Sequence, residues 1–296
     1  MFQILCITER GSRIAGSDGR VAVSKNEPPT DSFVPVDDLD AVVIEENAVS
    51  LSGCCLAMLA EKRIPVILCG RSHFPAAVLN PVISAGSDAR LMLQSQIDAP
   101  IAWKKQLWRK LIRAKIAGQS ANLVRRGKQN IDQLIALVRS GDPRNVEGRA
   151  AALYWSRLDL FPARKRDAPD ANRLFNYAYT VLFSAFARYL CAASLNPDIG
   201  IHHHGKYNHF SLASDLMEPF RPWIDQCVFS LIDSSPGNVE LLPETRIAML
   251  RLIYDCKVWI RSRRFVLFDA VNETVHSFKR SLISRDPGML ILPEVP

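Results

Sequence analysis

The chain has 296 residues with 48% apolar residues, 23% charged residues and a net charge of +7, which excludes a disordered or fibrous protein. No apolar run approaches the roughly 20 residues that would span a bilayer. The first residues lack the basic start and small-residue cleavage site of a signal peptide. The seven cysteines form no CxxC pair, which argues against a disulfide framework and a cysteine-based zinc site. We therefore expect a cytoplasmic protein with reduced thiols and no membrane partner.

The first part of the chain predicts a small β-rich domain over residues 1–80. Short segments rich in Val, Ile and Phe are separated by Gly, Asp, Pro and Asn. One short helix, apolar on one side, is expected to interrupt them. The expected strands are Phe2–Ile7, Arg20–Val23, Ser32–Val36, Asp40–Ile44 and Ile64–Cys69, and the expected helix is Gly53–Lys62.

The second part of the chain predicts a larger all-α domain. Residues 81–88 (PVISAGSD) are typical of a linker, and beyond them apolar residues recur at helical spacing through residues 89–296. The end, DPGMLILPEVP, holds too many prolines for a helix and predicts a loose or partner-docked tail. The fold class is therefore α+β. Helical spacing is found around 107–112, 131–138, 176–190 and 239–258.

The two parts of the chain, on either side of the predicted linker, also differ in charge. Residues 1–87 carry 7 basic and 10 acidic side chains, whereas the remaining 209 residues carry 30 and 20. A basic part joined to a mildly acidic one indicates a polyanionic partner for the basic part, although solubility alone would explain the charge as well.

One predicted helix, over 101–128, carries nine basic side chains and no acid. Lys105, Arg109 and Arg113 share a face, where like charges repel by a few tenths of a kcal/mol per pair. Phosphates would offset this repulsion, and two tryptophans could anchor the helix from its apolar side. The alternative is a solvated face that acids from elsewhere neutralise. The candidate phosphate contacts are Lys104, Lys105, Arg109, Lys110, Arg113, Lys115, Arg125 and Arg126.

Three clusters of acids or histidines are candidates for a site, and each has a structural alternative. Glu147 follows a possible N-cap asparagine and could only complement a helix dipole. Asp215 and Glu218 have the spacing of a capping box. The run His202–His204 could be a polar loop, and in an extended chain its middle residue would face away from the outer two.

Taken together, the clusters indicate a divalent metal. Carboxylates with one imidazole suit Mg²⁺ or Mn²⁺, and such an ion promotes displacement at phosphorus. The sequence contains no Walker loop, GxSxG elbow or HExxH helix that would provide a competing catalytic site.

The segments EGRAAALYW, ANRLFNYAYTVL and GIHHHGKYNHFSLASDLMEPFRPWID, in this order, closely resemble the CRISPR adaptation integrase, the first of the CRISPR-associated proteins. The form of the last segment is most similar to versions that accompany a single-protein RNA-guided effector nuclease. A β-rich domain before a helical catalytic domain is also this family's layout. The resemblance is strongest from Glu147 to Asp225 and covers essentially the whole chain.

The resemblance implies a site in which Glu147, His203 and Glu218 bind the divalent metal and are catalytic, with Asp215 as a supporting acid. His202 and His204 remain alternatives to His203. The implied reaction is transesterification, in which the 3′-hydroxyl of a captured DNA fragment attacks a phosphodiester at the edge of a CRISPR repeat. With water as the nucleophile the same site would act as a DNA endonuclease.

The resemblance also implies partners. These are double-stranded DNA held by the basic helix, a second copy bound through the β domain, a small ferredoxin-like second adaptation protein, and the effector nuclease. Two rival functions remain open on the residues alone. One is a zinc hydrolase that uses His202–His204, and the other is a non-catalytic nucleic-acid scaffold that uses only the basic helix.

Overall fold

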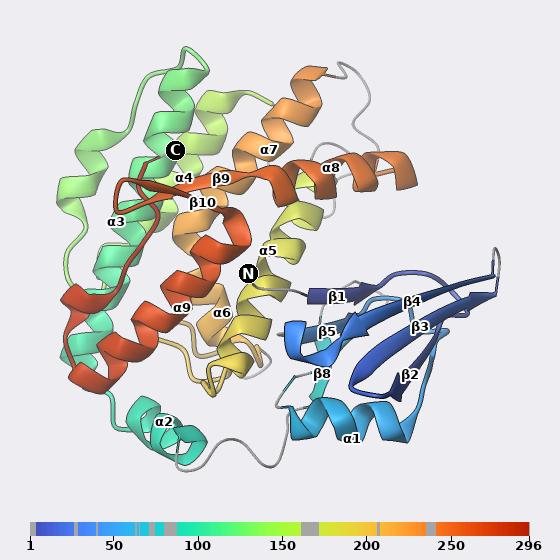
Figure 1. The fold of residues 1–296 in the computed structure, drawn as a ribbon. Coiled ribbons are helices and arrows are strands. Elements are labelled where there is room, and N and C mark those ends of the chain that lie inside the picture. The colour runs from blue at the N-terminus through green and yellow to red at the C-terminus, as the bar shows by residue number, and fades with distance from the viewer. Residues whose placement is uncertain are drawn as a thin grey trace. The chain divides into compact units, whose positions relative to one another are not determined.

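A computed structural model describes most of the chain (Figure 1). No helix in the part that it describes is long and apolar enough to cross a membrane. The described residues are 4–26, 29–39, 41–62, 64, 66–70, 75–79, 88–160, 172–205, 208–234 and 241–295.

The chain divides into two compact units. The N-terminal unit comprises Met1–Gln94 together with Ala187–Asn196, and the C-terminal unit comprises Ser95–Phe186 and Pro197–Pro296. The predicted linker 81–88 lies outside the described residues except for Asp88, where helix α2 (Asp88–Ile97) begins. The division falls within α2 and within a later helix, so the units are not two consecutive segments of the sequence.

The N-terminal unit contains two four-stranded sheets, helix α1 (Gly53–Glu61), the first part of α2 and the last residues of a later helix. In the first sheet three neighbouring strands are parallel and the fourth is antiparallel. The predicted helix and all five predicted strands are confirmed apart from their ends, and three short strands, at Arg13–Ser17, Ser50–Leu51 and Pro75–Leu79, were not predicted. The first sheet has the order β1 (Ile4–Ile7), β5 (Ala41–Ile44), β7 (Val66–Cys69), β8 (Pro75–Leu79), and the second β4 (Pro29–Pro35), β3 (Arg20–Asn26), β2 (Arg13–Ser17), β6 (Ser50–Leu51).

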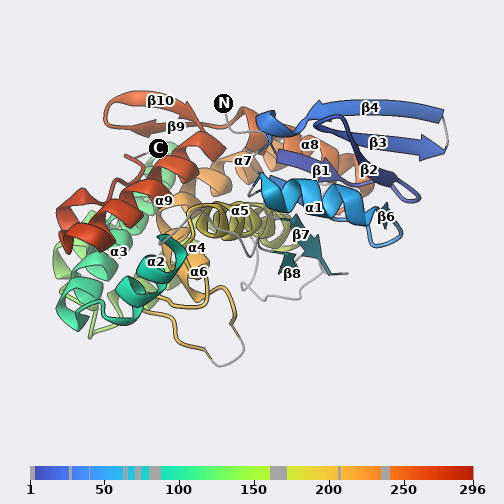
Figure 2. The ribbon, with the colours of Figure 1, turned by 60° about the horizontal axis from the view of Figure 1, so that its bottom comes forward.

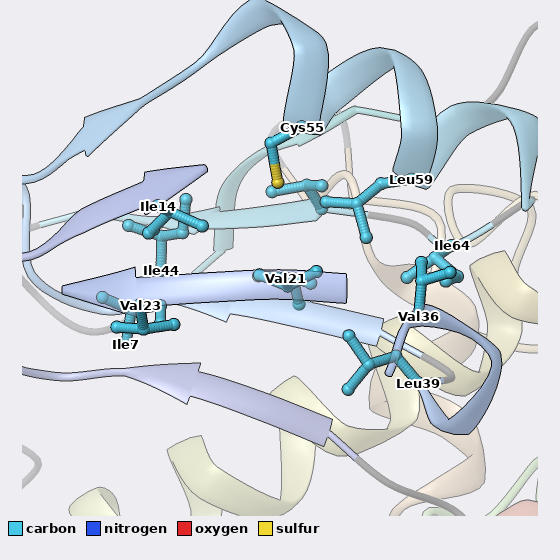
Figure 3. Close-up of a cluster of buried hydrophobic side chains, with 12 residues drawn as sticks. Ile7, Ile14, Val21, Val23, Val36, Leu39, Ile44, Cys55, Leu59 and Ile64 are labelled. Carbon is cyan, nitrogen blue, oxygen red and sulfur yellow. The ribbon is translucent and has the colours of Figure 1, made fainter. Parts of the chain in front are cut away.

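Both sheets contribute to one hydrophobic core, shown in Figure 3. Ile7 and Ile44 of the first sheet, Ile14 of the second and Leu59 of α1 are all buried in it. Helix α1 approaches β2 so closely that a Cβ on Gly16 would lie 3.0 Å from a backbone atom of α1. That glycine also explains why β2 was not predicted, because a glycine weakens the signal of a strand.

The C-terminal unit is mostly helical. Its long helix α3 contacts α4, α7 and the short helices η2 and η3. The elements are α3 (Ile101–Arg125), η2 (Asp132–Leu137), α4 (Val146–Leu158), α5 (Asn172–Ala192, whose last residues group with the N-terminal unit), α6 (Ser211–Leu216), η3 (Glu218–Phe220), α7 (Arg221–Ser234), α8 (Pro243–Asp255), β9 (Lys257–Ile260), β10 (Arg263–Val266), α9 (Leu267–Ser284) and η4 (Pro287–Met289).

Three features differ from the sequence prediction. The segment 131–138 forms a 3₁₀ rather than an α-helix. The helix predicted over 239–258 ends at Asp255, and a hairpin of β9 and β10 follows, which Figure 2 shows together with α9. Its turn residues Arg261 and Ser262 both have positive φ, the conformation of a two-residue turn that matches the strand twist. The C-terminal unit is therefore mostly but not entirely α.

The C-terminal tail packs on its own unit, so the expectation of a loose tail is wrong. Leu290 and Ile291 are buried. The backbone N–H of Ile291 donates to Ser277 Oγ at 2.9 Å, and Lys110 Nζ donates to the carbonyl of Leu290 at 2.5 Å. The tail thus lies against α9 and α3 and is irregular apart from the short 3₁₀ helix η4, with backbone groups satisfied in part by side chains.

Candidate active site

Glu147 lies in the first turn of α4, where two other residues cap the helix. Asn145 Oδ1 accepts from the N–H of Gly148 at 3.1 Å, which confirms the predicted N-cap. The carboxylate of Asp142 accepts from the N–H groups of Val146 and Glu147 at 3.0 and 2.9 Å. Since Asn145 and Asp142 accept from the free N–H groups of the first turn, the Glu147 carboxylate is available for another partner.

Asp215 is fully buried and holds the histidine loop. Its Oδ2 accepts from the N–H groups of Ile201 and His202 at 2.6 and 2.9 Å. Its Oδ1 lies 3.3 Å from the N–H of His203 and 2.6 Å from Nδ1 of the same residue. A Cβ on Gly200 would come within 2.4 Å of the His203 carbonyl oxygen, so the loop requires glycine there. Asp215 is therefore not part of a capping box, because its carboxylate binds a distant loop.

The three histidines have different environments. His202 stacks on the buried Trp108, with ring centroids 4.1 Å apart and an angle of 4°. His203 meets the same indole edge-on at 5.6 Å, and His204 is exposed. Because a carboxylate only accepts, Asp215 fixes a proton on Nδ1 of His203 and leaves the Nε2 lone pair as a possible metal ligand. The hydrogen bond to Asp215 raises the pKa of His203, whereas partial desolvation of the ring lowers the pKa of His202, although the residue as a whole is exposed.

Glu218 and Lys115 form a buried charged cluster with Glu147. Lys115 Nζ lies 2.6 Å from Glu147 Oε1 and 2.5 Å from Glu218 Oε2. Arg221 Nε lies 2.9 Å from the other Glu218 oxygen. Burial alone would raise the pKa of Glu218, but the attraction of Arg221 and Lys115 lowers it to about 2. Burial would lower the pKa of Lys115, but the attraction of Glu218 and Glu147 is larger and raises it.

The shifted pKa of Glu218 predicts how stability depends on pH. A lowered carboxyl pKa stabilises the fold fully above the unfolded-state value near 4.5, and this contribution is lost as pH falls toward about 2. Between pH 5 and pH 3 the free energy of unfolding should lose about 2 kcal/mol through this one group. Urea denaturation of wild type and Glu218→Gln at both pH values, in a metal chelator, measures it. The difference in the free energy of unfolding between the two proteins should be smaller at pH 3 than at pH 5. An equal difference at both pH values would contradict the prediction.

The structure brings Glu147 and Glu218 together on one cation, Lys115 Nζ. His203 lies near enough for the charges of Glu218 and Glu147 to raise its pKa further. Two carboxylates and an imidazole fit Mg²⁺ or Mn²⁺ chemically. Glu218 Oε2 is buried and lies 2.5 Å from Lys115 Nζ, so this oxygen already faces a cation. Within the described residues no three His, Cys, Asp or Glu side chains already stand as a metal-binding group, so binding of one metal by all three residues stays a prediction.

Lys115 was predicted as a phosphate contact, but the structure buries its side chain within the site. A signal for this burial was present in the sequence. Lys115 continues the four-residue series of Leu107 and Leu111, both of which are fully buried, and therefore lies on the same helix face. A charge on this face of α3 is directed into the unit rather than toward solvent.

The remaining basic candidates of the α3 region differ in exposure. Lys105 and Arg109 are exposed, and Arg113 is half-buried on the same face. Lys110 is occupied by carbonyls of the C-terminal tail, and Arg126 pairs with Asp233 at 2.9 and 3.1 Å. Lys104 is half-buried and Arg125 exposed. The face formed by Lys105, Arg109 and Arg113 is thus the part of the predicted set that is best placed for phosphates.

Comparison with known proteins identifies the family. The family model described as CRISPR associated protein Cas1 matches residues 5–238. The CRISPR-associated endonuclease Cas1 of Neisseria meningitidis serogroup C (strain 8013) is 30% identical over 267 residues, which cover 88% of this chain and 87% of that protein.

Solved structures agree with this assignment in fold. A casposase bound to its integration product has a TM-score of 0.75 and 18% identity, with 96% of this chain and 91% of the other covered. A chain of a Cas6-RT-Cas1–Cas2 complex has a TM-score of 0.76 and 18% identity, with 98% of this chain and 36% of that longer chain covered. The β-rich first part and mostly helical second part are shared with a Cas1 protein from Thermotoga maritima. The chain therefore belongs to the Cas1 family of CRISPR-associated proteins.

Proposed function

We propose that the chain is a metal-dependent DNA integrase and endonuclease that inserts captured DNA fragments into a CRISPR array by 3′-hydroxyl transesterification. The observation that carries this proposal is the convergence of Glu147 and Glu218 on one cation, beside an imidazole held by Asp215. Membership of the Cas1 family and the fold shared with a casposase bound to its integration product support the same reaction class.

The residues of the site have separate roles in this proposal. Glu147 and Glu218 would supply anionic oxygens and His203 Nε2 a neutral nitrogen to Mg²⁺ or Mn²⁺. The bound ion would polarise the phosphodiester and stabilise the negative charge that develops in the displacement. Asp215 orients the imidazole, and Arg221 fixes the Glu218 carboxylate. These contacts preorganise the ligands, so that less reorganisation is needed when DNA binds.

The test of this proposal is a strand-transfer assay. The full chain with its second adaptation protein, a labelled 3′-hydroxyl DNA fragment and a supercoiled plasmid bearing a CRISPR repeat should give labelled plasmid only with Mg²⁺ or Mn²⁺. Labelled product in a chelator, or its absence under every metal condition while DNA binding persists, would contradict the proposal.

We also propose the partners of this function. They are double-stranded DNA, a second copy of the chain bound through the β-rich N-terminal unit, the small ferredoxin-like second adaptation protein, and the RNA-guided effector nuclease. The Cas1–Cas2 complex and the casposase with its integration product, both similar to this chain in fold, support the adaptation protein and DNA respectively.

The two rival functions receive less support. A zinc site built on the histidine run needs its imidazoles to converge, whereas His202 stacks on Trp108 and His203 binds Asp215. A non-catalytic scaffold needs only exposed cations, and would gain nothing from a buried cluster of charges that is costly to desolvate.

The basic face of α3 predicts how strongly DNA affinity depends on salt. Replacing Lys105, Arg109 and Arg113 together by alanine should reduce the slope of log affinity against log salt by up to about 2.7, because each phosphate contact on duplex DNA contributes about 0.9. All duplex sequences should be weakened alike, since phosphates carry no sequence information. A salt titration of duplex binding measures the slope.

A second triple variant on the β9–β10 hairpin serves as the comparison. Arg261, Arg263 and Arg264 are exposed, and their loss should leave the slope nearly unchanged. If the hairpin variant flattens the slope and the α3 variant does not, the DNA path runs over the hairpin.

A further inference from the structure

Lys115 is a buried cation at the point where the proposed metal ligands meet. Its side chain is 8% exposed, and its Nζ contacts one oxygen of Glu147 on α4 and one oxygen of Glu218 at the start of η3. The three residues come from three separate elements of the C-terminal unit. We infer that Lys115 is a built-in counter-cation that holds Glu147 and Glu218 together and competes with the divalent metal for them. This inference rests on the metal site of the proposed function.

The charges of the cluster explain why a lysine is needed. Two carboxylates that approach each other away from water repel, and each also loses hydration. Arg221 compensates one oxygen of Glu218, and Lys115 lies between the other oxygen of Glu218 and one oxygen of Glu147. The charges of these two cations and two carboxylates therefore sum to zero. The protein's own groups can thus hold the carboxylates together.

The same geometry makes the lysine a competitor. Mg²⁺ binds oxygen at about 2.0–2.1 Å, so an ion shared by these two oxygens would have to lie in the region that Nζ occupies. Cations at such separations repel strongly where water is excluded. Metal binding therefore requires Nζ to leave Glu147 Oε1 and Glu218 Oε2. The lysine keeps the ligands assembled but weakens their affinity for the ion.

Metal titration of the stripped full-length protein tests this directly. The Mn²⁺ affinity of Lys115→Met, measured from the electron paramagnetic resonance signal of free Mn²⁺, should exceed that of wild type by about ten-fold or more, because a competing charge has been removed. In a chelator the same variant should unfold at a lower temperature, because the carboxylates lose their counter-cation. Added Mn²⁺ should reverse this loss.

Three further variants make the result specific. Lys62→Met removes a lysine from an exposed ion pair of equal length, 2.6 Å to Asp37, and should leave Mn²⁺ affinity unchanged. Lys115→Arg keeps the charge and should bind Mn²⁺ no more tightly than wild type. Lys115→Gln removes the charge but keeps a polar end, and replaces Lys115→Met if that variant does not fold.

The outcomes separate the inference from the proposed function. Mn²⁺ affinity that is equal or weaker in both uncharged variants would overturn the role of Lys115, while binding to wild type would leave the proposed metal site intact. Absence of Mn²⁺ binding in wild type and all variants would overturn both. Tighter binding in the uncharged variants, with Lys62→Met unchanged and Lys115→Arg no tighter than wild type, is the expected result.

Discussion

Replacing Glu147 by glutamine should lower the rate of strand transfer by about a thousand-fold or more, because loss of an anionic metal ligand removes several kcal/mol of transition-state stabilisation. Glutamine has nearly the same shape, and the α4 start is capped by Asn145 and Asp142 rather than by the Glu147 side chain. The fold and duplex binding should therefore persist, so that the loss is specific to the reaction.

The measurement uses the labelled donor and repeat-bearing plasmid, with duplex affinity and circular dichroism recorded alongside. Glu244 gives a matched control, since it is also an acid in the first turn of a helix, α8, but is exposed. Glu244→Gln should retain full activity. Full strand transfer by Glu147→Gln would show that the site lies elsewhere.

The sequence predicts most of the elements because their signals are local. The apolar segments of β1, β5 and β7 and the helical periodicity of α3 and α5 require only neighbouring residues to be read. The β9–β10 hairpin was missed although Val258 and Ile260 are buried and Lys257 and Trp259 exposed. This alternation has the period of a strand, but four residues are too short to outweigh the helical pattern that precedes them.

The arrangement of the site could not be predicted from local sequence patterns. The spacing of Asp215 and Glu218 is that of a capping box, but the Asp215 carboxylate binds N–H groups of a loop more than ten residues earlier. Lys115 meets Glu147 and Glu218 from distant positions in the chain. Its burial followed from the register of α3, whereas its partners depend on how α3, α4 and η3 pack. The family resemblance implied that Glu147 and Glu218 are metal ligands, but gave no place to Lys115.

Asp215→Ala should destabilise the protein by about 3–5 kcal/mol, the range for removing one member of a buried charged network. The substitution leaves the N–H groups of Ile201 and His202 without their acceptor, and burying such groups unpaired is costly. It also releases Nδ1 of His203, so the imidazole loses its fixed tautomer and orientation. Strand transfer should also fall, even at temperatures where the variant remains folded.

Urea denaturation of wild type and Asp215→Ala at neutral pH measures the loss, and Asp233→Ala serves as the control. The Asp233 carboxylate pairs with Arg126 at 2.9 Å but is 57% exposed, so its removal should cost less than about 1 kcal/mol. The contrast between the two aspartates tests whether burial and backbone hydrogen bonds, rather than an ion pair alone, give Asp215 its importance. Equal effects would mean that the histidine loop is held by other contacts, such as the stacking of His202 on Trp108. A large loss confined to Asp215→Ala would show that this carboxylate holds both the loop and the imidazole of the proposed site.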